Sequence, residues 1–296
     1  MRVVLTGSSG RLGRSIFNAL AASHAVIGID RSPFSTTHLL GDLTDRSILR
    51  EALKGADAIV HCAALHAPHV GVISDEEFQR VNVKGTRLLA EAAVVAGIRR
   101  FVFTSTTALY GHAVIRGGCT WIDEQTEPQP KSIYHRTKLE AERLLETFAS
   151  AELQIRVLRM SRSFPEPANM TATYRLHRGI DFRDVAEAHK AALTNNGNHF
   201  QRHIVSARTP FKPEDCKILA TDAAYAIRLR APALAAEFGR RNWPLPTVID
   251  RIYASASAGD VLGWQSRFGY DEVLAQLDRG SLEVLPAFSA SSNRPE

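Results

Sequence analysis

The chain has 296 residues, of which 45% are hydrophobic and 23% are charged, as in an ordinary globular protein. Its formal charge of +5 is small, and its arginines form isolated pairs such as Arg99–Arg100 rather than a basic stripe, so we expect no nucleic-acid partner. The apolar runs are short, no secretory leader pattern precedes "RVVLTGSSG", and the three cysteines (Cys62, Cys119 and Cys216) are scattered. These features predict a cytoplasmic protein with no membrane span and no metal site.

Strand-like and helix-like segments alternate through the first half of the chain. Short apolar runs predict buried strands, and apolar residues at helical spacing predict the helices between them. The expected strands are 2–6, 25–30, 57–64, 100–106 and 153–160, and the expected helices are 14–23, 82–97 and 132–148. Gly97 suits the C-terminal cap of the second helix. This alternation predicts an α/β fold of the Rossmann type, with a doubly wound parallel sheet covered by helices on both faces.

The pattern changes after residue 160. Segment 163–179 contains Pro165 and Pro167 and predicts a loop, whereas 183–195 predicts a helix and 202–207 a strand. From about residue 210 short helices alternate with turns, and the polar tail at about 287–296 is expected to be disordered. We therefore expect one domain over 1–160 and a small C-terminal portion over 161–296 that partly returns to the sheet.

The stretch "LTGSSGRLGRS" places Gly7, Gly10 and Gly13 between the first strand and the first helix. Glycines at this junction allow a tight turn and a close approach of backbone to a pyrophosphate, which the helix N-terminus also attracts. Asp30 ends the second strand, where a carboxylate can accept both ribose hydroxyls of NAD. Arg31 follows it and suits the 2′-phosphate of NADP. The first domain is thus predicted to bind NAD, with NADP left open.

Tyr134 and Lys138 stand four residues apart in "SIYHRTKLEAERLLETF", so they lie on the same side of the predicted helix 132–148. Taken alone, this spacing also fits a packed phenol beside a solvated ammonium group. The neighbouring motifs are needed to decide between the two interpretations.

With these motifs, the chain resembles the extended short-chain dehydrogenase/reductase family, the NAD-dependent epimerase/dehydratase group. The resemblance continues through "GDLTD", "HCAAL", "NVKGT", "FVFTSTTALYG" and "YHRTK" and covers at least residues 1–190. It implies an enzyme in which Thr106, Tyr134 and Lys138 are catalytic. Tyr134 would act as the base, with its pKa lowered by Lys138 and by the positive charge of an oxidised nicotinamide.

The resemblance also implies the residues that contact each ligand. Asp42 and Leu43 would lie against the adenine, and Ala63, Ala64 and Asn82 near the nicotinamide half. The implied cofactor-binding residues are Gly7, Ser9, Gly10, Arg11, Leu12, Gly13, Asp30, Arg31, Asp42, Leu43, Ala63, Ala64, Leu65, Asn82, Lys138 and Met160. The implied substrate-binding residues are His66, Ser105, Thr106, Arg162 and Arg175.

Two subfamily patterns restrict the kind of reaction that we expect. The 4,6-dehydratases resemble one another in an Asp-Glu pair after the catalytic threonine, whereas Thr107 and Ala108 follow it here. Nucleotide-sugar epimerases typically carry an asparagine at the position of Arg162, followed by a long nucleotide-binding insertion that this chain lacks. Both departures favour a smaller substrate without a nucleotide handle.

The segment "RMSRSFPEP…YRLHRGIDFRDV" resembles uronate dehydrogenases, in which the arginine that Arg175 matches meets the sugar carboxylate. Asp184 follows Arg175 at the same spacing, although Arg175 could also be a loop arginine paired with a surface acid. We therefore expect an NAD(P)-dependent oxidoreductase acting on a small sugar or sugar-acid-like substrate, anionic or polyhydroxylated. The alternative is a sugar or nucleotide-sugar epimerase of the UDP-glucose 4-epimerase type with tightly bound cofactor. A homodimer packed through helices near 84–96 and 133–148 is common in the family.

Overall fold

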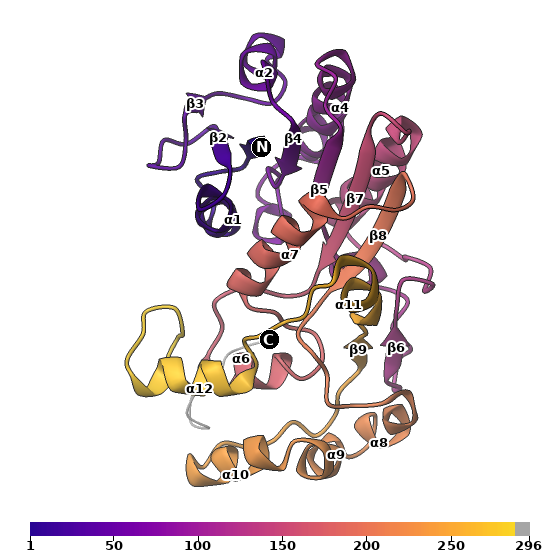
Figure 1. Cartoon of the computed structure of the whole chain (residues 1–296). Coiled ribbons are helices and arrows are strands. Elements are labelled where there is room, and N and C mark those ends of the chain that lie inside the picture. The colour runs from indigo at the N-terminus through magenta and orange to yellow at the C-terminus, as the bar shows by residue number, and fades with distance from the viewer. Residues whose placement is uncertain (288–296) are drawn as a thin grey trace.

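The computed structural model describes residues 1–287 and centres on a seven-stranded sheet (Figure 1). All its neighbouring strands are parallel, in the order β3-β2-β1-β4-β5-β7-β8. The strands are β1 (Arg2–Thr6), β2 (Ala25–Asp30), β3 (Leu39–Leu40), β4 (Ala58–His61), β5 (Arg100–Thr106), β7 (Gln154–Met160) and β8 (Phe200–Val205). Because strand order reverses at β1 and β4, a crevice opens at their carboxyl ends. The expected Rossmann-type fold is confirmed.

Helices cover both faces of the sheet, which explains why its strands are continuous apolar runs. One face packs against α1 (Arg11–Ala21), α7 (Phe182–Thr194) and α11 (Ala256–Leu262). The other face packs against α2 (Arg46–Leu53), α4 (Gly85–Val95) and α5 (Ile133–Phe148). Strand β8 and helix α7 come from the second half of the chain, so that half contributes to the sheet as well.

The helix expected over 82–97 begins earlier than its apolar pattern indicates. It consists of α3 (Asp75–Phe78), a π-helical segment η2 (Gln79–Lys84) and then α4. The π-helical segment contains Asn82, and such segments often lie at functional sites. Gly97 has a φ of +69° just after α4, as its expected capping role requires.

The loop expected over 163–179 is wrong in part, because residues Ala168–Tyr174 form helix α6. Pro167 stands directly before the first helical residue. A backbone N–H at that position would have no partner within the helix, so proline is tolerated there. Ala168 and Ala172 are fully buried in a second hydrophobic core. Burial of this face therefore stabilises a helix in a segment that its prolines made look irregular.

The second core holds together the C-terminal portion, which lies below the sheet in Figure 1. Its remaining helices are η4 (Pro213–Asp215), α8 (Cys216–Leu219), α9 (Ala223–Arg230), α10 (Pro232–Arg240) and α12 (Tyr270–Asp278). A small parallel sheet pairs β6 (Thr120–Ile122) with β9 (Arg251–Tyr253). Two short turns of 3-10 helix, η1 (Ala67–His69) and η3 (Thr107–Tyr110), follow β4 and β5. The polar tail expected to be disordered falls almost entirely outside the described residues.

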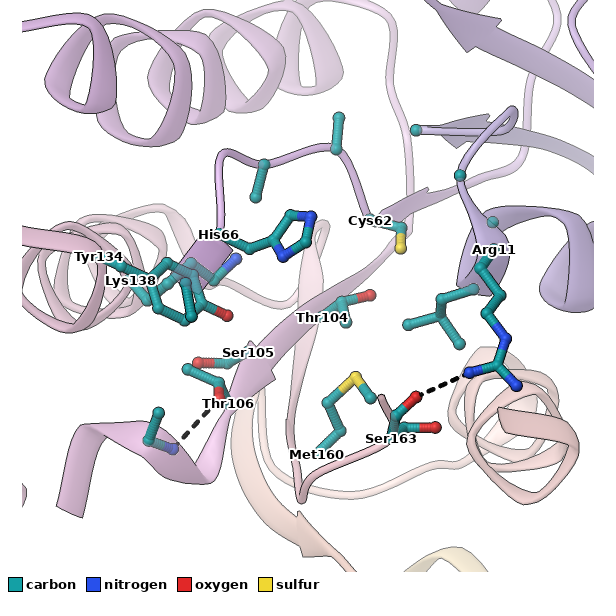
Figure 2. A pocket seen from close by; sticks show the side chains of 18 of the residues that line it. Arg11, Cys62, His66, Thr104, Ser105, Thr106, Tyr134, Lys138, Met160 and Ser163 are labelled. Carbon is teal, nitrogen blue, oxygen red and sulfur yellow. Dashed lines mark hydrogen bonds between the residues drawn. The ribbon is translucent and has the colours of Figure 1, made fainter. Parts of the chain in front are cut away.

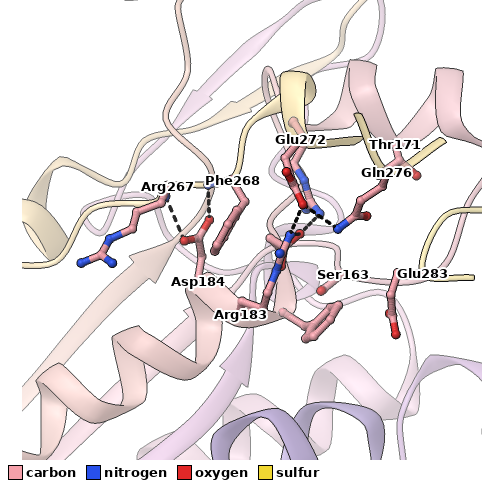
Figure 3. A network of polar contacts seen from close by, with 12 residues as sticks. Ser163, Thr171, Arg183, Asp184, Arg267, Phe268, Glu272, Gln276 and Glu283 are labelled. Carbon is pink, nitrogen blue, oxygen red and sulfur yellow. Dashed lines mark hydrogen bonds and ion pairs between the residues drawn. The ribbon is translucent and has the colours of Figure 1, made fainter. Parts of the chain in front are cut away.

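A polar network fastens the C-terminal segment to the start of α7 (Figure 3). The two carboxylate oxygens of Asp184 accept the backbone N–H groups of Arg267, at 2.9 Å, and Phe268, at 3.0 Å. Arg183 lies 3.1 Å from Glu272 on α12 and stacks on the ring of Phe268. The sequence associates Asp184 with Arg175 by spacing. In the structure, the Asp184 carboxylate instead binds backbone N–H groups. Within residues 1–287, no helix is long and apolar enough to cross a membrane.

Candidate active site

A cavity of about 760 Å³ opens at the carboxyl ends of the sheet strands (Figure 2). Its size falls in the range usual for cofactor and substrate sites. Most residues predicted from the sequence line it: Gly7, Ser9, Gly10, Arg11, Leu12, Gly13, Asp30, Arg31, Asp42, Leu43, Ala63, Ala64, His66, Ser105, Thr106, Tyr134, Lys138, Met160 and Arg162. The fold thus brings the predicted cofactor and catalytic residues into one space.

The turn between β1 and α1 can be built only with glycine at two positions. Gly7 has a φ of +75°, and a Cβ atom there would lie 2.6 Å from the backbone nitrogen of Ala63. A Cβ atom on Gly13 would lie 1.9 Å from the carbonyl oxygen of Gly7. The resulting bare backbone at the N-terminus of α1 fits a pyrophosphate, so these residues suit a dinucleotide.

Asp30 is held in place at the end of β2. Its carboxylate accepts the backbone N–H of Ser9 and that of Ser32, each at 3.0 Å. Arg31, which could have met a 2′-phosphate, instead lies 3.8 Å from Asp42 and 3.6 Å from Glu77. The environment at this end of the pocket therefore favours ribose hydroxyls over a phosphate.

Asp42 forms a strong ion pair at this end of the pocket. Arg80 binds its carboxylate at 2.9 Å, and this hydrogen bond holds the pKa of Asp42 well below its usual range. Arg80 also pairs with Glu77 at 2.6 Å. Asp42 is consequently ionised at any pH at which the protein would work, and it keeps Arg31 turned toward acidic neighbours.

Leu65 and Asn82 do not line the cavity but stand directly behind its wall. Asn82 accepts the backbone N–H of Leu65 at 2.8 Å and donates to its carbonyl at 2.9 Å. His61 bridges the hydroxyls of Thr6, at 2.7 Å, and Thr86, at 2.9 Å, below the same loop. Burial lowers the pKa of His61 to about 3, so it is neutral here. This buried network fixes the loop that carries Ala63 and Ala64.

Two elements supply the predicted catalytic residues. Thr106 ends β5, and its Oγ1 accepts the backbone N–H of Ala108 at 3.1 Å. Tyr134 and Lys138 come from the first turns of α5, whose N-cap is Ser132. Figure 2 shows them and Thr106 on one side of the pocket, with Arg11 opposite.

Burial governs the ionisation of both helix residues. It raises the pKa of Tyr134 to about 12, although a hydrogen bond with Thr106 acts in the opposite direction. It lowers the pKa of Lys138 to about 8, and the ammonium group lies 3.8 Å from the centre of the Phe103 ring. The protein's own residues therefore raise the phenol pKa, contrary to the lowering expected from the sequence. That expectation also counted the charge of an oxidised nicotinamide, which the protein does not itself carry.

Arg175 is the predicted substrate residue that the structure does not bring into the pocket. It stands at the C-terminal end of α6, with 9% of its side chain exposed and its guanidinium 3.2 Å from Asp181. It borders a separate small cavity instead of the main one. The expected loop would have let Arg175 reach the substrate, whereas the helix that forms there leaves it paired with a buried acid.

Arg178, three residues further along, lines the main pocket and was missed by sequence reasoning. Its guanidinium carbon lies 4.2 Å from the centre of the Tyr174 ring, and its Nε is buried without a hydrogen-bond partner among residues 1–287. The other pocket arginines are paired within that part of the chain: Arg11 with Glu283, Arg31 with Asp42 and Glu77, Arg162 with Glu166, and Arg251 with Asp250. Arg178 is the pocket guanidinium with no acidic partner there.

Two further residues of the pocket wall carried no sequence signal. Phe164, from the loop after β7, stacks on the predicted substrate residue His66, with ring centres 5.8 Å apart. Tyr253 on β9 also lines the pocket, and its hydroxyl donates to the carbonyl of Thr107 at 3.2 Å. Only the pairing of distant segments creates these contacts, so no local pattern could have indicated them.

A family model described as the NAD dependent epimerase/dehydratase family matches residues 3–173. Among curated relatives, the 4-hydroxy-2-methyl-3-oxo-4-farnesyl-3,4-dihydroquinoline-1-oxide ketoreductase of Stigmatella aurantiaca is 35% identical over 158 residues. This match covers 49% of the present chain and 45% of that enzyme. The chain spans less than half the length of the first curated relatives that it matches.

Solved structures agree in fold over nearly the whole chain. MoeE5 in complex with UDP-glucuronic acid and NAD gives a TM-score of 0.68 at 25% identity, covering 95% of this chain and 100% of that one. A mutated uronate dehydrogenase gives a TM-score of 0.67 at 17% identity, covering 96% and 88% of the two chains. The expected family resemblance and its nicotinamide cofactor are thereby confirmed. By the match over more than half of its length, the chain belongs to the NAD dependent epimerase/dehydratase family.

Proposed function

We propose that the protein is an NAD-dependent dehydrogenase acting on a hydroxyl-bearing carbon of a small, polyhydroxylated and anionic substrate. One observation carries the proposal: Thr106, Tyr134 and Lys138 share a cavity with the glycine turn and Asp30. A proton acceptor and a dinucleotide cradle are therefore available in the same space. We assign cofactor binding to residues 1–160 and substrate binding mainly to residues 161–296.

In this proposal Tyr134 takes the hydroxyl proton of the substrate on its Oη, and Thr106 orients that hydroxyl. We expect the positive charge of Lys138, together with that of an oxidised nicotinamide, to favour the phenolate of Tyr134, whose pKa is raised by burial. With a pKa of about 8, Lys138 is largely charged at neutral pH. NAD supplies the hydride acceptor when bound.

Arg178 replaces Arg175 as the residue that selects an anionic substrate. An arginine without an acidic partner can bind a carboxylate or phosphate through two parallel hydrogen bonds. Its buried Nε remains unsatisfied among the described residues, which makes an anionic partner energetically favourable. Tyr174 supports the guanidinium by stacking and leaves its edge free for that partner.

The base is tested by Tyr134→Phe, which keeps the ring and removes the proton acceptor. Turnover should fall by about 10²–10⁴-fold, the usual contribution of such catalysis. NAD affinity, measured by calorimetry, should change little. Tyr225→Phe, on the exposed side of α9, is the matched control and should be fully active. A Tyr134→Phe protein that retains wild-type turnover would falsify the assignment.

The substrate class is tested by comparing kcat/KM for glucuronate and for glucose, a uronic acid and its neutral parent sugar. Arg178→Ala should lower the value for the acid by one to two orders of magnitude, equivalent to about 1.5–3 kcal/mol for a charged hydrogen bond, and leave the neutral sugar nearly unaffected. Arg175→Ala should instead lower the melting temperature, because it leaves Asp181 with one fewer buried partner. Equal losses for both sugars in Arg178→Ala would remove the preference for acids.

A sugar epimerase is the second candidate, because the same tyrosine and lysine would serve it. Its specific support is a curated relative named as a 4-epimerase, the N-acetyl-alpha-D-glucosaminyl-diphospho-ditrans,octacis-undecaprenol 4-epimerase of Escherichia coli O157:H7, which is 29% identical over 170 residues. The two functions differ in cofactor turnover: a dehydrogenase releases NADH into solution with substrate, whereas an epimerase gives no net reduction. Absorbance of NADH during incubation with glucuronate, glucose and UDP-glucuronic acid separates them.

We infer a preference for NAD over NADP from the positions of two side chains. Asp30 faces the pocket with fixed geometry, and Arg31 is occupied by Asp42 and Glu77. Calorimetric titration should therefore give the lower dissociation constant for NAD. The reverse order would mean that Arg31 leaves its acidic partners to bind the 2′-phosphate.

We infer that the protein is a cytoplasmic homodimer. The C-terminal end of α4 exposes Val94 and Val95, which a partner's α4 and α5 would cover. The three cysteines are free thiols, as a reducing compartment would keep them. Light scattering on a sizing column should give twice the mass of the chain, and cell fractionation should find the protein with soluble markers.

A further inference from the structure

We propose that Glu142 is a positioning residue of the active site, holding the end of β5 against α5 and balancing the charge of Lys138. The proposal rests on the proposed function, because it assigns a role to the pair that Tyr134 and Lys138 form. Glu142 lies one helical turn after Lys138 on α5, and none of its side chain is exposed. A buried carboxylate of this kind needs several partners to remain ionised.

Glu142 has those partners on three neighbouring strands. Arg159 on β7 donates to its carboxylate at 2.6 Å through Nη2 and at 3.1 Å through Nε. Ser105 on β5 donates its hydroxyl to the same carboxylate at 2.5 Å. Arg202 on β8 lies 3.6 Å away. Strands β5, β7 and β8 and helix α5 are therefore joined at one carboxylate.

This junction lies directly behind the reacting groups. Ser105 immediately precedes Thr106, so anchoring the serine hydroxyl sets the direction in which the threonine leaves the strand. Arg159 also donates to the Tyr110 hydroxyl at 2.7 Å, which secures the turn η3 after Thr106. Ser105, predicted from the sequence to meet the substrate, thus has its hydroxyl directed into the protein. Its action on the substrate is through Thr106.

Charge gives Glu142 a second role. Lys138 is buried among Tyr134 on its own helix, Phe103 on β5, and His61 and Cys62 at the end of β4. Against the effect of burial, Cys62 and then Glu142 raise the pKa of Lys138, and Glu142 is the carboxylate of the two. The charges around Glu142 itself are Arg159, Arg202 and, one turn further along α5, Glu146. Removal of the carboxylate should therefore make Lys138 lose its proton at lower pH.

The test uses Glu142→Gln, which preserves shape and removes charge, with Glu146→Gln as the matched control on the same helix. In protein labelled with 13C at lysine Cε, the resonance of Lys138 is assigned by Lys138→Met and followed against pH. The midpoint should move below the wild-type value of about 8 in Glu142→Gln and stay unchanged in Glu146→Gln. The kcat with NAD and glucuronate should fall about ten- to a hundredfold, with the KM for NAD nearly constant.

Two further variants keep the proposal falsifiable if Glu142→Gln does not fold. Glu142→Asp retains the charge, so it should restore the Lys138 midpoint while kcat stays reduced. Ser105→Ala retains the ion pair with Arg159 and should lower kcat without moving that midpoint. The proposal is overturned if folded Glu142→Gln keeps the wild-type kcat, or if its Lys138 midpoint does not move. If Glu142→Gln does not fold, a wild-type kcat in folded Ser105→Ala overturns it. The titration of Lys138 does not depend on turnover. A failure of the proposed function would instead appear as an active Tyr134→Phe variant, so the two failures can be distinguished.

Discussion

Lys138 holds a titratable amine in a position where only 3% of its surface is exposed. Burial lowers its pKa from 10.5 to about 8, which corresponds to about 3 kcal/mol of lost stability when the amine is charged. Because the folded pKa lies below the unfolded one, this loss is complete below pH 8. It disappears as the pH rises toward 10.5, since both states are then neutral. The proposed catalytic position of Lys138 therefore lowers the stability of the protein.

We therefore expect Lys138→Met to be more stable than the wild type at neutral pH, by about 1–3 kcal/mol, and to be inactive. The advantage of the variant should decrease steadily between pH 8 and 10.5. Urea denaturation of both proteins at several pH values measures the difference. A difference independent of pH would indicate that the gain comes from packing and not from the buried charge.

At this scale the sequence predicted the residues whose chemistry is local in the chain. Tyr134 and Lys138 are one turn apart, and Gly7 and Gly13 belong to one short turn, so spacing alone brings each pair together. Arg175 shows the limit of such reasoning. Whether Arg175 or Arg178 faces the pocket depends on helix α6, and α6 depends on burial against a core that forms from distant segments.

Among the elements, the junction of β1 and α1 has the least tolerance for change. A Cβ atom on Gly13 would lie 1.9 Å from the Gly7 carbonyl oxygen, so Gly13→Ala must open the turn that we propose contacts the pyrophosphate. We expect NAD affinity to fall at least tenfold, a loss of about 1.4 kcal/mol or more. Gly239→Ala in α10 is the control, because nothing lies within 4 Å of its added atom. That variant should bind NAD normally and be slightly more stable. Calorimetry on both variants gives the answer.

Strands β1, β2, β4, β5 and β7 were predicted well because each is a continuous apolar run, whereas helix α2 and the two-residue strand β3 were not predicted. The two strands of the small sheet were missed because each has only three residues and its partner is distant in sequence. Helix α6 was missed because prolines at its start resemble loop signals, although Pro167 stands just before the first helical residue, where no backbone donor is needed. Local patterns therefore fail where long-range pairing supplies the stabilisation.

Over the whole molecule, the polar contacts of Asp184 link helix α7 to the C-terminal segment. A further link between the sheet and the C-terminal portion is a small hydrophobic cluster of Tyr110, Ile122, Ile204 and Tyr253. Asp184→Ala would leave the backbone N–H groups of Arg267 and Phe268 without their acceptor, at a cost of about 1–3 kcal/mol for each. We expect the segment after residue 264 to exchange amide hydrogens faster, while strands β1 and β4 keep their protection. Hydrogen exchange followed by mass spectrometry distinguishes this from global destabilisation, in which both regions would respond.

The pairing of β6 with β9 has a consequence for synthesis on the ribosome. The predicted cofactor residues all lie at or before the end of β7 in the chain, whereas the partners of β6 and of the Thr107 carbonyl, which are β9 and Tyr253, are synthesised much later. The substrate side of the pocket is therefore completed by the last part of the chain to leave the ribosome.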